Sequence, residues 1–308
     1  MMDYRKIIKN RKLRMRILRL LSFVPDRVMI PLQYYIQLGR FPNLNNPQRY
    51  TEKLQIYKMK YRNPLMVQCV DKYEVRDYIK TCGLESILIP CYGIYNSVGE
   101  IPFDKFPNQF VIKTTDGSGG CNVLICRDKE HLNLHEVREK LSSWNNFMRN
   151  NPGREWAYSQ IKRTRFIVEK FVESEPNEQG LVDYKFFCFN GKCEMLYVIS
   201  DRNLGVDARF GVFSRSFEKM DVCRNDERPM KRSIPKPANF EKMIKYAELL
   251  SKPFPHVRVD LYNVNGNIMF GELTFYDGSG YFSYTPDSFD FELGSKFDLA
   301  SILGGGKY

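Results

Sequence analysis

The chain of 308 residues contains only three histidines and no pair of cysteines in a C-x-x-C arrangement. Since structural zinc sites are built from such pairs with further cysteine or histidine ligands, we expect no zinc. His131 and His135 lie four residues apart in a polar segment, which favours surface positions. No apolar run reaches the roughly 18 residues of a transmembrane helix, and no secretory leader is expected. The eight cysteines are therefore expected to be free thiols in the cytoplasm.

Several signatures of nucleotide chemistry are also missing. No Gly-Lys-Ser/Thr follows the glycines of residues 116–120, which excludes a Walker A loop. An Asp-x-Asp pair, the usual mark of a sugar-nucleotide glycosyltransferase, is absent, which disfavours that class. The basic charge is not accompanied by an RNA-binding, zinc-finger or helix-turn-helix signature, so no nucleic-acid partner is expected.

The composition is that of a folded protein, with 43% apolar and 14% aromatic residues. The net charge of +11 is uneven, because residues 1–30 hold nine basic and two acidic residues, a net +7. Apolar residues alternate with these charges, so residues 1–24 predict a basic amphipathic helix. Such a helix suits an anionic membrane surface. The alternative is a helix packed on the body of the protein with a solvated basic face.

Apolar periodicity and turn residues predict a mixed α and β chain. Helices are expected over residues 1–24, 51–60 (with Thr51 as the cap), 64–81, 129–148 and 240–250. Strands are expected near 87–95 and over 109–114, 122–126, 166–171, 184–189, 193–200, 209–214, 256–263 and 267–273. Asn190-Gly191 and Asn265-Gly266 predict tight hairpin turns.

Residues 110–120 combine a strand carrying Lys113 with a glycine-rich loop. A lysine supplies a point charge for phosphate oxygens, and glycines let backbone N–H groups approach them closely. The segment therefore indicates a polyphosphate site, although an ordinary turn would give the same pattern.

A second cluster lies on the hairpin of residues 257–274. Asp260 on one strand and Glu272 on its partner can converge on one cation, and Mg²⁺ prefers oxygen ligands of this kind. Arg258 precedes Asp260 by two residues, so both side chains point to one face of the strand. The alternative is a surface cluster of salt bridges.

In chain order these clusters resemble the ATP-grasp superfamily, and within it the TupA-like group associated with teichuronopeptide and other surface-polysaccharide synthesis. The resemblance spans roughly residues 40–290. It rests on Phe41-Pro42 with Thr51-Glu52-Lys53, Asp71-Lys72-Tyr73-x-Val75-Arg76, Val111-Ile112-Lys113 with Asp116-Gly117-Ser118-Gly119-Gly120, Glu169-x-Phe171, Asp183-Tyr184-Lys185-Phe186, and Arg258-Val259-Asp260 with Gly271-Glu272-Leu273-Thr274-Phe275.

The resemblance implies an α+β ATP-grasp fold in which ATP sits between two α+β subdomains. The expected parts are a basic helical extension (1–45), a helical and α/β subdomain (46–108), a small subdomain with the glycine-rich lid (109–165) and a large subdomain with the metal site (166–308). The implied ATP-binding residues are Lys72, Lys113, Asp116, Gly117, Ser118, Gly119, Gly120, Glu169, Phe171, Glu175 and Lys185.

Asp260 and Glu272 are implied as ligands of one or two Mg²⁺ ions, with Thr274 where related ligases often have asparagine. Arg258 is implied as the group that stabilises an oxyanion, and Arg202 as a partner of the substrate carboxylate.

The activity implied is ATP-dependent ligation of a carboxylate to an amine through an acyl phosphate. The expected substrates are a uronic acid or other carboxylated sugar of a glycan, and an amino acid or peptide. The location expected is the cytoplasm, at or near the inner face of the membrane. Alternatives are a glycosyltransferase, a kinase-like member that phosphorylates a sugar hydroxyl, and a polymer-binding module without catalysis.

Overall fold

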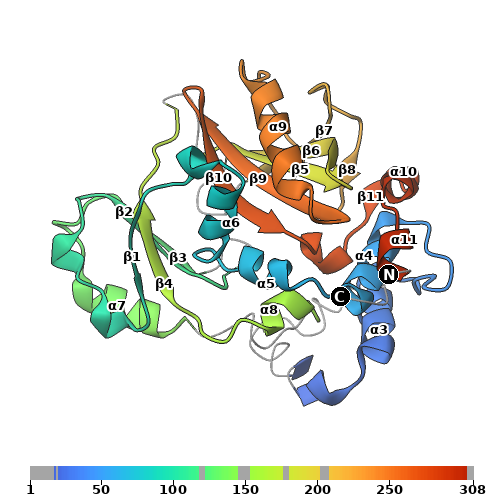
Figure 1. Cartoon of the computed structure of the whole chain (residues 1–308), viewed down its shortest axis with the longest axis horizontal. Helices are drawn as coiled ribbons and strands as arrows, with labels where there is room; N and C mark the ends of the chain where they lie inside the picture. The colour runs from blue at the N-terminus through green and yellow to red at the C-terminus, as the bar shows by residue number, and fades with distance from the viewer. Residues whose placement is uncertain are drawn as a thin grey trace.

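The computed structural model describes residues 17–18, 20–117, 122–144, 153–175, 180–201 and 208–303. Within these ranges the chain forms two larger antiparallel sheets with helices between and around them (Figure 1). The expected glycines at 119–120, together with Ser118 and Arg202, lie outside the described residues, as does most of the helix expected over 1–24.

The smaller sheet has the strand order β1-β4-β2-β3. Its strands are β1 (Cys91–Tyr95), β2 (Phe110–Thr114), β3 (Val123–Cys126) and β4 (Phe166–Lys170). A separate hydrophobic core under this sheet includes side chains from α7 (Leu134–Ser142) and the 101–106 segment. The sheet therefore takes strands from both sides of the boundaries expected at 108/109 and 165/166.

The larger sheet has the order β10-β9-β5-β6-β7. Its strands are β5 (Asp183–Phe189), β6 (Lys192–Ser200), β7 (Arg209–Ser214), β9 (His256–Val264) and β10 (Asn267–Thr274). Both predicted hairpin turns are confirmed, since Asn190, Gly191, Asn265 and Gly266 all have positive φ, as a two-residue turn of this kind requires. Helix α9 (Phe240–Ser251) covers one face of this sheet (Figure 1).

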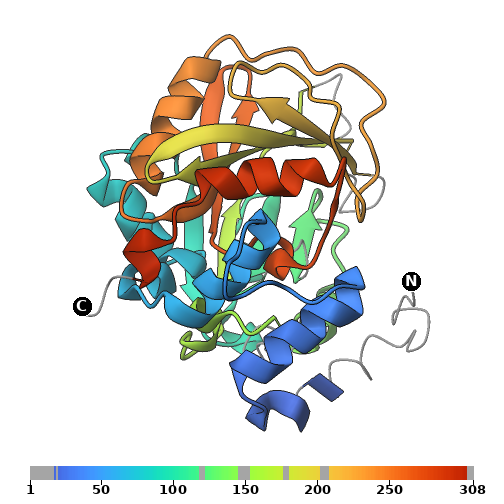
Figure 2. The same ribbon diagram turned by 90° about the vertical axis from the view of Figure 1, so that its right-hand side faces the viewer.

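The remaining helices gather on the opposite face of the larger sheet and beside it (Figures 1 and 2). They are α3 (Asp26–Leu38), α4 (Tyr50–Lys60), α5 (Pro64–Val70), α6 (Val75–Thr81), α8 (Trp156–Ser159), α10 (Ser288–Lys296) and α11 (Ala300–Leu303). A short ribbon of β8 (Cys223–Arg224) and β11 (Tyr284–Thr285) completes the described strands.

The single helix expected over 64–81 is wrong, because Asp71 divides it into α5 and α6. The Asp71 Oδ1 atom accepts hydrogen bonds from the backbone N–H groups of Tyr73 (2.8 Å) and Glu74 (3.0 Å). A side chain that takes backbone donors in this way competes with the helical pattern. The interruption leaves Lys72 on a turn rather than on a helix.

Three other expectations need correction. Thr51 does not cap α4: the cap is Arg49, and Thr51 bonds instead to the buried Asp290 of α10. The helix expected from Lys129 begins only at Leu134, because the Asn133 side chain accepts from the N–H groups that start it. Helix α3, which contains Pro31, was not among the predicted helices.

Seven cysteines are described and all are free thiols, as expected. His131 and His135 are exposed, also as expected. The third histidine, His256, is fully buried between α4 and the larger sheet. Its Nδ1 faces the carbonyl oxygen of Cys188 at 3.0 Å, so Nδ1 must donate, and Nε2 then accepts from the Tyr50 hydroxyl at 2.9 Å. The ring is thus held in its neutral form.

We predict an acid-dependent loss of stability from His256. Burial lowers the pKa of His256 from 6.5 to about 4. As the pH falls through 6.5 the unfolded chain gains a proton that the folded chain refuses, so stability is fully present above pH 6.5 and falls until about pH 4. The loss is about 3 kcal/mol at 1.36 kcal/mol per pKa unit.

Urea unfolding at several pH values between 7 and 4 measures this loss. The fall in the free energy of unfolding per pH unit should be smaller in His256→Gln than in the wild type. It should be unchanged in His131→Gln, which alters an exposed ring. Equal slopes in the wild type and His256→Gln would contradict the assignment.

Candidate functional site

The smaller sheet presents a lysine and a glutamate on one face. Val111 of β2 pairs with Glu169 of β4, so Lys113, two residues further on, shares that face. Lys113 Nζ lies 2.9 Å from Glu169 Oε2, and Arg76 Nη1 lies 3.4 Å from Glu169 Oε1. Arg76 also donates to the carbonyl of Ile89 at 2.9 Å. Glu169 is therefore a largely buried carboxylate between two cations.

Lys72 joins this group from the turn between α5 and α6. Its backbone N–H donates to the Thr115 carbonyl at 2.9 Å, and its ammonium contacts the Gly117 carbonyl. Burial lowers the pKa of Lys72. The lysine thus holds the start of the glycine-rich loop. Asp116 is buried and accepts from the Thr164 hydroxyl at 2.6 Å, so its carboxylate serves the loop's own structure.

The larger sheet carries the acidic pair with an arginine between its members. Arg258 donates from Nε to Asp260 Oδ1 at 2.7 Å and from Nη2 to Asp260 Oδ2 at 2.8 Å. The same Nη2 lies 3.2 Å from Glu272 Oε1 and 3.0 Å from Thr274 Oγ1. Arg258 and Glu272 therefore lie on the same face of the sheet as Asp260.

A β-bulge at Gly271 produces this convergence. From the Asn265-Gly266 turn up to Phe270 the pairing is regular, and a strict continuation would place Gly271 opposite Asp260 and turn Glu272 to the other face. One extra residue at Gly271 shifts the register, so Glu272 pairs with Asp260. A Cβ at Gly271 would lie 3.0 Å from the Asp260 carbonyl oxygen, which explains the glycine.

Lys185 of β5 completes the charged face. It pairs with Asp260 across the strands, and its ammonium contacts the Asp260 carboxylate and lies 3.4 Å from Asp183 Oδ2. Burial alone would raise the pKa of Glu272, but the charges of Lys185, Lys72 and Arg258 outweigh it and lower that pKa to about 2. Glu272 is therefore ionised at any ordinary pH.

Asp277 and Arg224 belong to the same network, and the sequence reasoning missed both roles. Asp277 is almost completely buried and accepts from Arg258 and, at 3.1 Å, from Arg224 Nη1. Burial by itself would lower the pKa of Arg258, but Asp260 and Asp277 raise it well above its usual value. No spacing signal links Arg224 to the hairpin, since it arrives on β8 from a separate part of the chain.

Asp277 begins a turn whose next three residues, Gly278, Ser279 and Gly280, all have positive φ. Side chains of α4 hold the turn: Gln55 Nε2 donates to the Gly280 carbonyl at 3.0 Å, and the buried Lys58 Nζ donates to the Ser279 carbonyl at 2.8 Å. Left-handed backbone at a non-glycine residue is costly and persists only where surrounding contacts enforce it. The turn is therefore rigidly placed beside Arg258.

The two charged faces meet at Lys72 and Glu272. Both line one cavity of about 10 Å³, together with Val75, Tyr158 and residues of β10. Over the described residues, no group of three or more His, Cys, Asp or Glu side chains is placed so that it could hold a metal ion. Two ionisable carboxylates on paired strands nevertheless match the usual protein share of a Mg²⁺ shell, in which phosphate oxygens and water supply the rest.

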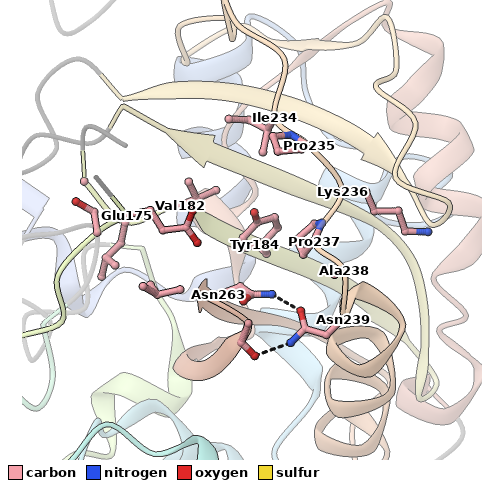
Figure 3. A pocket seen from close by; sticks show the side chains of 15 residues that line it. Glu175, Val182, Tyr184, Ile234, Pro235, Lys236, Pro237, Ala238, Asn239 and Asn263 are labelled. Carbon is pink, nitrogen blue, oxygen red and sulfur yellow. Dashed lines mark hydrogen bonds between the residues drawn. The ribbon is translucent and has the colours of Figure 1, made fainter. Parts of the chain in front are cut away.

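A larger cavity of about 210 Å³ lies elsewhere, on the α9 side of the larger sheet (Figure 3). Tyr184, Asn239 and Asn263 line it, and so does Glu175, whose carboxylate accepts from the Asn265 N–H at 2.9 Å. Glu175 is thus not placed beside Lys72 or Lys113, and its expected role in ATP binding stays a prediction. Phe171 lies under the guanidinium of Arg127, 4.9 Å from its ring centroid.

Two antiparallel sheets with Lys72 beside the acidic pair of the larger one agree with the expected ATP-grasp class of proteins, and the family comparison supports that class. The TupA-like ATPgrasp family model matches residues 52–298. The chain belongs to the TupA-like ATP-grasp family. No protein of curated function is detectably similar to it in sequence.

Solved structures with a partial likeness include D-alanine–D-alanine ligases and a D-cycloserine synthetase. The ligase from Bacillus anthracis is 18% identical with a TM-score of 0.40, and the match covers 67% of this chain and 57% of that one. The ligase from Helicobacter pylori is 15% identical with a TM-score of 0.42, and the match covers 80% of this chain and 68% of that one. D-cycloserine synthetase DcsG is 15% identical with a TM-score of 0.39, and the match covers 76% of this chain and 72% of that one. The chain thus spans less than two thirds of the first of these. Likeness at this level supports no residue-by-residue correspondence.

We predict that Gly271→Ala disturbs the acidic pair. The added Cβ meets backbone that cannot move aside freely, so the variant should lose about 1–3 kcal/mol of stability. Urea unfolding measures the loss. Gly99→Ala is the matched control, because a Cβ there meets nothing closer than Ser97 Oγ at 3.9 Å. A Gly271→Ala protein as stable as the control would contradict the role of the bulge.

Proposed function

We propose that the protein is an ATP-dependent, ADP-forming ligase that joins a carboxylate to an amine through an acyl phosphate. The observation that carries the proposal is that Lys72 lies beside Glu272 of the Arg258, Asp260 and Glu272 cluster and is also close enough to Lys113 for the two charges to interact. Lysines from one side and a carboxylate pair from the other are what a nucleoside triphosphate with its metal needs. Membership of the ATP-grasp class supports it.

In this proposal Lys72 and Lys113 bind phosphate oxygens of ATP, and Glu169, now paired with Lys113, orients that lysine. Asp260 and Glu272, with Thr274 beside them, would hold Mg²⁺, which supplies charge neutralisation at the β- and γ-phosphates when bound. The low pKa of Glu272 suits a metal ligand, because no proton has to leave before the cation binds.

The proposed reaction has two displacements. A substrate carboxylate oxygen attacks the γ-phosphorus, the bond to the bridging β,γ-oxygen breaks, and ADP leaves with that electron pair. The amine nitrogen then attacks the acyl carbon, inorganic phosphate leaves, and the nitrogen loses a proton. No side chain becomes covalently attached, so the chain contributes positioning and charge.

Arg258 is the group we assign to the developing negative charge. Asp260 and Asp277 hold its guanidinium rigidly, so little reorganisation accompanies the reaction. The turn at Asp277–Gly280 borders the side of the site where we place the acceptor. Arg202, which we propose as a partner of the substrate carboxylate, lies outside the described residues.

The substrates we propose are a uronic acid or another carboxylated sugar of a surface glycan, and an amino acid or peptide amine. The support is the TupA-like family, whose resemblance to this chain points to surface-polysaccharide chemistry. A kinase that phosphorylates a sugar hydroxyl is the second candidate, because the same lysines and carboxylates serve any transfer of the γ-phosphate.

Lys113→Met should reduce ATP turnover by about a hundredfold or more, because it removes a charge from the proposed phosphate site. Asp260→Asn should do the same. Lys170→Met is the matched control, since Lys170 lies beside Glu169 on the same strand with its side chain exposed. Phosphate release with Mg²⁺-ATP measures the effect. Equal turnover in Lys113→Met and Lys170→Met would exclude this site.

A panel of uronic acids crossed with amino acids, assayed for ADP, phosphate and product mass together, tests the reaction. A ligase gives a product lighter than the two substrates by one water, with stoichiometric ADP and phosphate. A product heavier than the sugar by one phosphoryl group, without free phosphate, would make the protein a kinase. Hydrolysis of a UDP-sugar without ATP would favour the glycosyltransferase instead.

A further inference from the structure

Exposed apolar side chains are concentrated in one short part of the chain. Over the described residues, seven of the eleven large apolar side chains that are exposed fall between positions 20 and 41. They are Leu20, Phe23, Val28, Leu32, Tyr35, Ile36 and Phe41. Scattered single exposures are normal on a soluble surface, whereas a grouping of this kind marks an interaction site.

Helix α3 orders four of these side chains into a stripe. Val28, Leu32, Tyr35 and Ile36 follow the i, i+4, i+7, i+8 spacing of one helix face. The opposite face, which carries Met29, Ile30, Gln33 and Tyr34, is buried against the protein. The helix is thus apolar on two sides, and only one side has a partner over the described residues. Figure 2 shows α3 in dark blue at the lower edge of the molecule.

The stripe is held firmly to the body. The Tyr34 hydroxyl lies 2.9 Å from Thr51 Oγ1, and the Tyr281 hydroxyl donates to Gln33 Oε1 at 2.8 Å. Arg154 bonds to Asp26 at 2.7 Å and to the Leu21 carbonyl at 2.7 Å. Tyr35 stacks on Phe41 with ring centroids 4.5 Å apart. The apolar surface is therefore presented in a fixed orientation.

The charge of the chain decides between two possible partners of the exposed apolar face of α3, a second copy of the chain and a lipid surface. Residues 1–30 carry a net +7, so the sequence leading into the stripe is strongly basic. Two copies of the chain that met through this face would bring two such segments together, and like charges would oppose the contact. An anionic lipid surface offers the opposite charge together with an apolar layer for the side chains. Tyrosine and other aromatic side chains favour that boundary.

We propose that the outer face of α3, with Phe23 and Phe41 at its two ends, binds an anionic bilayer surface with the help of the basic residues that precede it. The helix lies in the interface and does not cross the bilayer; none of the described helices is long and apolar enough to span one. The proposal extends the expected contact beyond residues 1–24 and is independent of the reaction proposed above.

Flotation with vesicles of equal parts phosphatidylcholine and phosphatidylglycerol tests the proposal. The wild-type chain should float with these vesicles and not with pure phosphatidylcholine. The double variant Leu32→Glu with Tyr35→Glu should bind about tenfold more weakly or worse, because each change removes apolar contact and adds a repelled charge. Leu134→Glu is the matched control: Leu134 and Leu32 are both 42% exposed, but Leu134 lies on α7. It should float like the wild type.

A second variant, Arg14→Gln with Arg16→Gln, keeps the stripe and should bind the anionic vesicles more weakly than the wild type; unchanged binding would contradict the role of the basic residues. Thermal unfolding of every variant should remain one cooperative transition, which separates weaker binding from loss of the fold; Tyr35→Glu also removes the stacking on Phe41. Absence of flotation, or equal flotation of the Leu32→Glu, Tyr35→Glu protein, would overturn the proposal. So would sedimentation showing a dimer that this double variant dissociates, because the occupant would then be a second copy.

Discussion

The buried guanidinium of Arg258 is the interaction on which the charged site depends. It holds Asp260, Asp277, Glu272 and Thr274 around one point, and three of these groups are carboxylates. Burying Asp260 and Asp277 without a partner would cost several kcal/mol each, so the arginine makes the arrangement possible. It also ties the hairpin of β9 and β10 to the turn at Asp277–Gly280. A shift of the hairpin or of the turn would therefore be transmitted to the other through the Arg258 side chain.

Two local departures from regular structure bring the remaining groups to Arg258. The bulge at Gly271 turns Glu272 onto the face of Asp260, and the Asp71 side chain breaks a helix so that Lys72 can reach the same space. Each interrupts the regular backbone hydrogen bonding, and each places one side chain of the candidate site. Irregularities at strand ends and helix ends commonly serve this purpose. The rigid elements set the distance between the two sheets, and these two departures set where the charges point.

The sequence predicted structure best where the spacing of residues allows only one local geometry. Arg258 and Asp260 share a face because strands have a period of two, and both Asn-Gly turns formed as expected. Lys113 was predicted from its strand and the glycine-rich loop that follows, whereas Lys72 came from the family resemblance, because no local pattern says that the two lysines are near each other. The broken helix was missed because Asp71 acts through its side chain against a helical pattern that is otherwise regular. Asp277 and Arg224 were missed because burial of a charged pair is a property of the packed core. Helix α3 was missed because it is apolar on two sides, so its sequence lacks the single apolar face of an ordinary surface helix.

A short chain of hydrogen bonds connects helix α3 with the turn beside Arg258. Gln33 on the buried side of α3 accepts from Tyr281, the residue that directly follows the turn, while Gln55 and Lys58 of α4 hold the turn itself. One layer of helix therefore separates the proposed lipid-facing surface from the proposed acceptor side of the site. If both proposals hold, a glycan acceptor attached to a lipid would be met by an enzyme already oriented on the same bilayer. The gain would be in orientation rather than in chemistry, because the charged groups around Arg258 are assembled without the membrane.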